Sequence, residues 1–198
     1  MNFYSIKLHK PKFWESKNNI FVFFLKPVSL LIKLFIFIRK KIAKNIKFKI
    51  PIICIGNIYI GGTGKTPSTI FLANELYKIG KNPAIVRKYY KDHSDEHQLI
   101  NKYFKNVIIN KNRTHAIYDA IEKGFDSVVL DDGFQDYNIK KDVNILCFNQ
   151  NQKIGNGLIF PSGPLREDLS AILNAQIILI NGNKDKIFED RIKNINNN

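Results

Sequence analysis

Residues 51–67 read PIICIGNIYIGGTGKTP, and this stretch decides the fold class. A short β-branched run at 51–55 is followed by a glycine-rich turn at 61–64, then by Lys65, Thr66 and a helical pattern. A strand, a glycine-rich turn and a helix in this order, with Lys-Thr after the last glycine, form a P-loop. The stretch therefore predicts a phosphate-binding turn between a strand and a helix of an α/β domain.

The residue types in the turn fit binding of ATP with Mg²⁺. Glycines let backbone N–H groups approach the phosphates, Lys65 reaches the β- and γ-phosphates, and the Thr66 hydroxyl is a candidate Mg²⁺ ligand. The usual motif has a glycine five residues before Gly64, and here that position is Tyr59. A glycine-rich turn that binds nothing is the alternative, which Lys-Thr at this spacing disfavours. The predicted nucleotide-binding residues are Gly61, Gly62, Thr63, Gly64, Lys65 and Thr66.

The chain downstream of the turn alternates between strand and helix patterns. A first helix has apolar residues at Ile70, Ala73 and Leu76 and stops at Gly80. Alternation of this kind predicts a mostly parallel sheet flanked by helices, as in P-loop NTPases. The further strands are expected at 84–86, 107–109, 127–130, 143–148 and 177–180, and the further helices from about 97 and over 113–123.

An acidic pair ends one of these predicted strands. Asp131 and Asp132 follow the apolar run at 128–130, as in the Walker-B arrangement that places an aspartate beside P-loop Mg²⁺. Two adjacent carboxylates are costly unless a cation neutralises them. The alternative is that one Asp merely caps the turn before Gly133. The metal ligands predicted here are Thr66, Asp131 and Asp132.

The positive charge is concentrated at the N-terminus. Residues 1–50 hold twelve Lys or Arg and one acid, Glu15, a net charge of +11 that leaves only +3 of the total +14. This distribution argues against nucleic acid as a partner, and no pattern indicates a protein partner. Cys54 and Cys147 lie inside apolar runs, which favours a reducing, cytoplasmic setting over a disulfide.

Residues 20–38 are almost wholly apolar but are interrupted by Lys26 and Lys33. On a helical wheel the lysines and Ser29 form one narrow stripe, and the wide remainder is apolar. This pattern favours a helix lying in the membrane interface, and the basic residues at 39–41 suit anionic headgroups. A spanning helix with snorkelling lysines and an ordinary helix packed on the domain remain alternatives.

Several segments together resemble the tetraacyldisaccharide 4′-kinase family, whose members phosphorylate the lipid A disaccharide precursor. They are ICIGN at 53–57 running into GGTGKTP at 61–67, LDDGFQ at 130–135, GNG at 155–157, PSGPLRE at 161–167 and LKPVS at 25–29. In that family a small residue often precedes the double glycine, so Tyr59 is less anomalous than the general motif suggests.

The resemblance implies an ATP-dependent kinase acting on the 4′-hydroxyl of a tetraacyldisaccharide 1-phosphate. It implies Asp95 as the base for the sugar hydroxyl, with Lys65 and Asp132 as further catalytic residues. It also implies a peripheral or monotopic protein at the cytoplasmic face of the bacterial inner membrane. The partners are then the lipid A disaccharide precursor and the membrane surface.

The sequence departs from the family in two segments and in length. A Ser-Arg-Gly-Tyr segment is replaced by RKYY at 87–90, and Gly-Asp-Glu-Pro is replaced by SDEH at 94–97. Family members carry a longer C-terminal half than this chain. Within the chain we expect a membrane-associated helical segment at 1–48 and a P-loop kinase core at 49–198. The alternative functions are a truncated or degraded P-loop protein that binds nucleotide without turnover and, more weakly, another P-loop ATPase acting on proteins.

Overall fold

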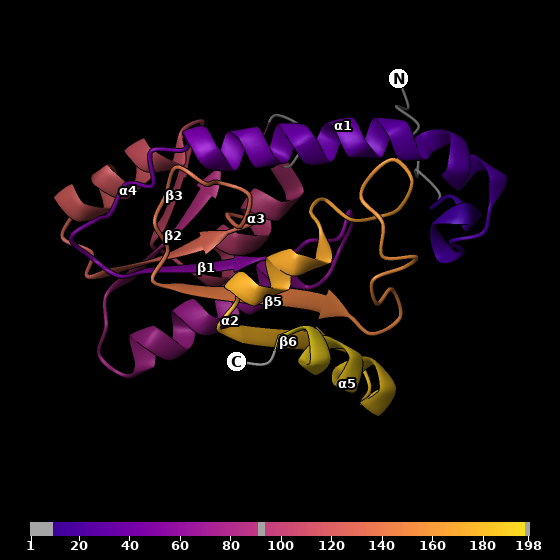
Figure 1. Cartoon of the computed structure of the whole chain (residues 1–198). Coiled ribbons are helices and arrows are strands. Elements are labelled where there is room, and N and C mark those ends of the chain that lie inside the picture. The colour runs from indigo at the N-terminus through magenta and orange to yellow at the C-terminus, as the bar shows by residue number, and fades with distance from the viewer. Residues whose placement is uncertain (1–9, 91–93, 197–198) are drawn as a thin grey trace, which may run out of the picture.

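The computed structural model describes residues 10–90 and 94–196, with the side chains of residues 94–97 outside that description. Six parallel strands form one sheet in the order β3-β2-β4-β1-β5-β6 (Figure 1). This arrangement confirms the predicted parallel sheet. The strands are β1 (Ile52–Gly56), β2 (Pro83–Lys88), β3 (Val107–Asn110), β4 (Ser127–Asp131), β5 (Val143–Asn149) and β6 (Ile177–Asn181).

Helices cover both faces of the sheet, because alternate side chains of the central strands point to opposite faces. Ile55 of β1 belongs to a core shared with α2 (Lys65–Lys78) and α3 (Ser94–Tyr103). Cys54, one residue earlier, belongs to the opposite core. That core is completed by α4 (Arg113–Glu122), the 3-10 helix η2 (Leu169–Asn174) and α5 (Lys186–Ile195).

Local signals fix where the helices start and stop. The helix α2 starts after Gly64, which has φ +85°, and its end is followed by Gly80 at φ +82°, as expected for αL glycines. No element is expected from the sequence after residue 180, yet α5 forms there. Its start is capped by Asp185, whose side chain accepts a hydrogen bond from the Phe188 amide at 3.0 Å.

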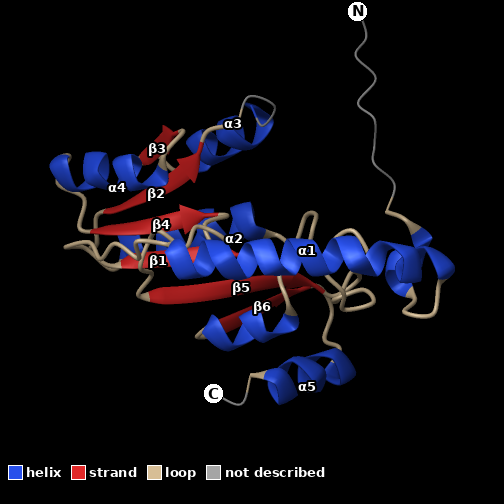
Figure 2. Cartoon of the chain, turned by 45° about the horizontal axis from the view of Figure 1, so that its top comes forward, coloured by secondary structure: helices blue, strands red, loops and turns tan. Residues whose placement is uncertain are grey.

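The helix α1 (Ile20–Ile42) runs along one side of the body, as both views show (Figures 1 and 2). It contacts the body through polar side chains. Ser29 Oγ donates to the Ile159 carbonyl at 2.9 Å, Lys33 pairs with Asp168 at 2.7 Å, and Lys40 pairs with Glu167 at 2.7 Å. Three members of the polar stripe predicted from the sequence, Ser29, Lys33 and Lys40, therefore face the protein.

Most of the other side chains of α1 are apolar and exposed, although Val22 is buried. The helix is long and apolar enough to cross a membrane by length and composition. An exposed apolar face of this extent marks an interaction surface. The exposed residues are Ile20, Phe21, Phe23, Phe24, Val28, Leu30, Leu31, Leu34, Phe35, Phe37, Ile38 and Ile42.

Candidate nucleotide-binding site

The P-loop lies at the carboxyl edge of the sheet, between β1 and α2. Strand β1 is central and pairs with β4 on one side and β5 on the other. Ligands of open α/β sheets bind outside the carboxyl ends of such strands, where the order of connection switches direction. The strand ends that surround the P-loop therefore define the candidate site.

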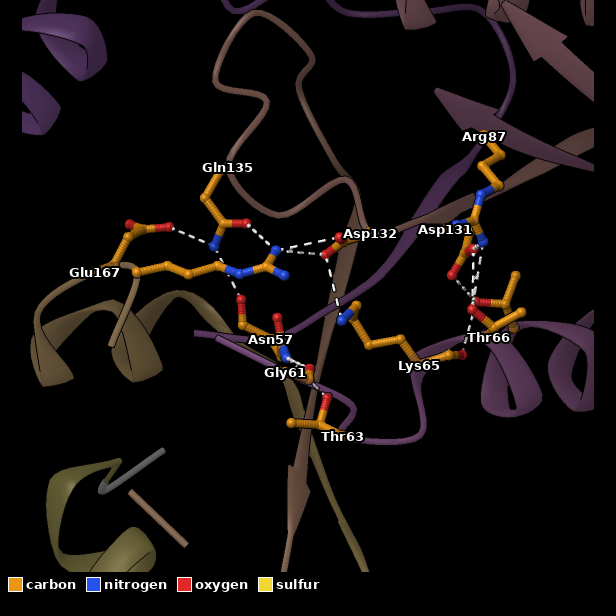
Figure 3. A network of polar contacts seen from close by, with 12 residues as sticks. Asn57, Gly61, Thr63, Lys65, Thr66, Arg87, Asp131, Asp132, Gln135 and Glu167 are labelled. Carbon is orange, nitrogen blue, oxygen red and sulfur yellow. Dashed lines mark hydrogen bonds and ion pairs between the residues drawn. The ribbon is translucent and has the colours of Figure 1, made fainter. Parts of the chain in front are cut away.

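Two asparagines from different strand ends hold the P-loop in place. Asn57, which follows β1, donates from Nδ2 to Thr63 Oγ1 at 2.9 Å and to the Gly61 carbonyl at 3.3 Å (Figure 3). Asn181, the last residue of β6, donates from Nδ2 to the Thr63 carbonyl at 2.6 Å. A Cβ added at Gly64 would lie 2.5 Å from the Asn181 amide nitrogen, so only glycine fits there. The turn is thus fixed before any phosphate arrives.

Asp131, the last residue of β4, is fully buried beside the start of α2. Its two carboxylate oxygens accept hydrogen bonds from Thr66 Oγ1 at 3.3 Å and from Thr69 Oγ1 at 3.2 Å. Arg87 is the register partner of Asp131 on β2 and donates to the same carboxylate (Figure 3). Burial raises the pKa of the Asp131 carboxyl, and the Arg87 guanidinium opposes that rise.

Asp132 turns away from the strand with φ +54° and faces the P-loop lysine. Its Oδ1 lies 3.7 Å from Lys65 Nζ, and both of its oxygens accept from Arg166 Nη1, at 3.0 and 3.1 Å. Burial alone would raise the pKa of Asp132, but Lys65 and Arg166 outweigh it and the pKa is lowered. Burial lowers the pKa of Lys65, against the influence of Asp132. Opposite charges therefore meet where the terminal phosphates of a nucleotide would lie.

Arg166 reaches the site because its segment pairs with the residues that precede the P-loop. The Ile60 amide donates to the Pro164 carbonyl at 2.8 Å, and the Arg166 amide donates to the Ile58 carbonyl at 2.7 Å. The next residue, Glu167, accepts from Gln135 Nε2 at 2.9 Å on one oxygen, and its other oxygen faces Lys40 of α1. The segment therefore connects α1 with the nucleotide site.

A cavity of about 450 Å³ opens in front of the P-loop. The Thr66 hydroxyl and the Asp131 carboxylate are hard oxygen donors 3.3 Å apart, the kind that Mg²⁺ prefers. Among the described residues, no three His, Cys, Asp or Glu side chains gather to hold a metal by themselves. This donor set fits a Mg²⁺ ion held jointly by one or two side chains, phosphate oxygens and water. The lining includes residues 61–67, Arg87, Arg113, Asp131, Asp132 and Arg166.

The structure brings together most of the residues predicted from sequence. Residues 61–66, Asp131 and Asp132 surround one cavity. Asp95 falls in the first turn of α3, and Leu99 of the same helix lines that cavity, but the Asp95 side chain is outside the described residues. Its role stays a prediction.

Sequence reasoning missed four partners in this site. Arg166 belongs to the segment 161–167 that marks the family resemblance, and that motif could have flagged it. Arg87 and Arg113 lie at or just after strand ends, where basic residues near a P-loop are a weak signal. Asn181 carries no motif, and only its position at the end of a strand could have identified it.

Comparisons with known proteins agree on one family. The family model described as tetraacyldisaccharide-1-P 4′-kinase matches residues 21–197. A tetraacyldisaccharide 4′-kinase of Pelagibacter ubique is 41% identical over 197 residues, which is 98% of this chain and 62% of the relative. One of Rickettsia akari is 33% identical and covers 92% of this chain and 61% of its own length. The chain thus spans about three fifths of the length of these relatives.

Solved structures agree with the fold. LpxK from Aquifex aeolicus, solved in complex with ATP, is 28% identical with a TM-score of 0.70. The match covers 81% of this chain and 59% of that one. The hydrogenase maturation factor HypB from Archaeoglobus fulgidus, at 11% identity and a TM-score of 0.52, covers 87% of this chain and 85% of its own and shares the fold alone.

Proposed function

Because the chain belongs to the tetraacyldisaccharide-1-P 4′-kinase family, we propose that it transfers the γ-phosphoryl group of ATP to the 4′-hydroxyl of the lipid A disaccharide precursor. The observation that carries the proposal is the arrangement of Lys65 and Asp132 at 3.7 Å in front of a P-loop held by Asn57 and Asn181. Phosphoryl transfer depends mainly on positioning and charge neutralisation, and this arrangement provides both.

Each P-loop residue has a role in this reaction. Backbone N–H groups of residues 61–66 bind the phosphates, and Lys65 neutralises charge on the β- and γ-phosphates. Thr66 and Asp131 are the proposed Mg²⁺ ligands, with Asp132 close to the same position. Bound Mg²⁺ supplies further positive charge to the phosphate oxygens. Arg166 donates to Asp132 and lines the cavity. Its guanidinium therefore places a positive charge beside the phosphoryl group that is transferred.

The acceptor hydroxyl needs a base, and Asp95 is the proposed one. Support comes from the family resemblance of residues 94–97 and from the backbone, which places Asp95 at the start of a helix that borders the cavity. A carboxylate in this role accepts the hydroxyl proton as the phosphoryl group is transferred.

The helix α1 is proposed to hold the protein at the cytoplasmic face of the inner membrane. Its polar stripe is occupied by the body, so its exposed apolar side chains are the ones available to the acyl region of a bilayer. Attachment of this kind keeps the kinase next to an acceptor whose acyl chains remain in the membrane. Residues 1–48 are the proposed membrane segment and 49–198 the proposed kinase core.

The test is transfer of ³²P from [γ-³²P]ATP to the tetraacyldisaccharide 1-phosphate in detergent micelles with Mg²⁺. We expect a labelled lipid product from the wild-type chain and none from Lys65→Ala, and calorimetry should show at least tenfold weaker ATP binding for that variant. Lys123→Ala, at an exposed position on the far end of α4, is the matched control. ATP binding without any labelled lipid would refute the kinase and leave a nucleotide-binding protein.

A further inference from the structure

The segment that carries Arg166 to the nucleotide site is also the place where α1 is attached to the body. Ser29 of α1 donates to the Ile159 carbonyl at 2.9 Å and accepts a hydrogen bond from the Ser162 amide at 3.0 Å. Two lysines of the same helix pair with acids a few residues further along. Residues 159–168, here called the linking segment, therefore lie between α1 and the P-loop.

Three consecutive residues of the linking segment make contacts in two different directions. Arg166 donates to both oxygens of Asp132 in the nucleotide site, at 3.0 and 3.1 Å. The next two residues, Glu167 and Asp168, each pair with a lysine of α1 at 2.7 Å. Because the three residues share one stretch of backbone, the contacts with α1 also determine where Arg166 lies.

The two ion pairs with α1 differ in burial. The side chains of Lys33 and Asp168 are 55% and 43% exposed, so their pair contributes little. Glu167 is only 1% exposed, and Lys40 makes the one ion pair of its carboxylate within the described part of the chain. Loss of Lys40 would leave this carboxylate buried without its counter-charge, which is costly. The linking segment would then have to shift until the carboxylate reached water.

Gln135 provides a second connection between Glu167 and Arg166. Its Nε2 donates to Glu167 Oε1 at 2.9 Å, and its Oε1 lies 3.5 Å from Arg166 Nη1 (Figure 3). A movement of the Glu167 carboxylate therefore changes both the backbone that carries Arg166 and a polar partner of its guanidinium.

The place of Arg166 matters most for the last phosphate of a nucleotide. Arg166 lines the nucleotide cavity and shares Asp132 with Lys65, the residue type that contacts the β- and γ-phosphates in a P-loop. Under the proposed function its guanidinium lies beside the phosphoryl group that is transferred. ADP lacks this group, so displacement of Arg166 should weaken the binding of ATP more than the binding of ADP.

We propose that Lys40 is a positioning residue for Arg166. It neutralises Glu167 and thereby fixes the linking segment, so that the helix with the exposed apolar face also sets how tightly the site holds the γ-phosphate of ATP. This inference rests on the proposed function for the place of the γ-phosphate.

The experiment measures ATP and ADP affinity of the full chain by calorimetry with Mg²⁺ in nonionic detergent micelles. Lys40→Ala should bind ATP about tenfold more weakly, while its affinity for ADP should change less than about twofold. The unchanged ADP affinity shows that the variant is folded and that its P-loop is intact. Arg166→Ala should give the same pattern, and Lys40→Ala/Arg166→Ala should bind ATP no more weakly than Arg166→Ala alone, because both changes remove the same contact.

Two further variants separate the position of Lys40 from its charge. Lys41→Ala removes the neighbouring exposed lysine of α1, whose ammonium lies over the Phe37 ring of the same helix, and it should match the wild type. Lys40→Arg keeps a cation opposite Glu167 and should bind ATP within about threefold of the wild type.

Four outcomes would overturn the inference: an equal loss of ATP and ADP affinity, no loss of either, an additive loss in the double variant, or the same loss in Lys41→Ala. The measurement needs no acceptor and no phosphoryl transfer, so it is separate from the kinase test. A wild-type chain that binds ATP without labelling the lipid would refute the proposed function, while the comparison of ATP with ADP would still decide the role of Lys40.

Discussion

Replacement of Asn181 by alanine tests whether the far edge of the sheet shapes the P-loop. Asn181 closes β6, which is separated from β1 by β5, yet its Nδ2 donates to the Thr63 carbonyl at 2.6 Å. Thr63 is 1% exposed, so water cannot readily replace the lost donor. The substitution Asn181→Ala therefore leaves a buried carbonyl oxygen without its hydrogen bond.

The penalty for an unsatisfied buried acceptor is about 1–3 kcal/mol. The variant can relieve it by moving the turn until the carbonyl reaches water, but ATP binding then has to reverse that movement. The cost consequently appears as reduced ATP affinity, since the binding-competent turn is only fractionally populated. An energy of about 1–3 kcal/mol corresponds to a roughly five- to 150-fold increase in the Kd for ATP.

Calorimetry of ATP with Mg²⁺ measures this change, and thermal unfolding shows whether the fold is affected. Asn183→Ala is the matched control, because Asn183 is exposed and lies two residues further on. A variant Asn181→Ala that binds ATP as tightly as the wild type would refute the reasoning. If its Tm falls while the affinity stays the same, Asn181 only stabilises the sheet edge.

Two further predictions follow from the site and from α1. Asp132→Asn should abolish Mg²⁺-dependent ATP binding and lower the free energy of unfolding by about 1 kcal/mol. Asp131→Asn should abolish it too, and should lower the free energy of unfolding by about 3–5 kcal/mol because it breaks the buried ion pair between Asp131 and Arg87. Both are measured by calorimetry and denaturant unfolding, and equal stability of the two variants would contradict this difference. Leu34→Glu, on the exposed face of α1, should weaken cosedimentation with anionic vesicles at unchanged Tm. The control Leu173→Glu, at a similarly exposed position on η2, should leave cosedimentation unchanged. Equal vesicle binding by the two variants would exclude α1 as the membrane contact.

The order of strands and helices could be predicted because each element carries its own periodicity. The stretch 51–67 alone places a strand, a turn and a helix, and the structure has β1 and α2 there. The helix α5 was predictable in principle, since Asp185 caps it and Phe188 and Ile192 recur at helical spacing on the buried side.

Partners across the site could not be predicted, because they depend on strand order and on long-range pairing. Arg87 meets Asp131 only because β2 lies beside β4, and the alternating pattern of elements does not specify this neighbour. Arg166 meets Asp132 only because residues 164–166 pair with residues 58–60. A motif states which residue types bind phosphate, but the buried partners that hold those residues come from distant parts of the chain.

The helical periodicity of α1 predicts a polar face and an apolar face, but it does not say which of the two faces contacts the protein. The lysines and Ser29 form a polar stripe, and such a stripe suits either lipid headgroups or polar groups of the protein. Ser29 donates to the Ile159 carbonyl, and Lys40 lies 2.7 Å from Glu167, which is 1% exposed. Glu167 also accepts a hydrogen bond from the side-chain amide of Gln135, and the same amide donates to the Asn57 carbonyl beside the P-loop. A continuous set of contacts therefore connects the polar stripe of α1 with the nucleotide site. The face that was expected to meet headgroups thus joins the helix to the candidate nucleotide site, and only the apolar face is left for the proposed contact with a bilayer.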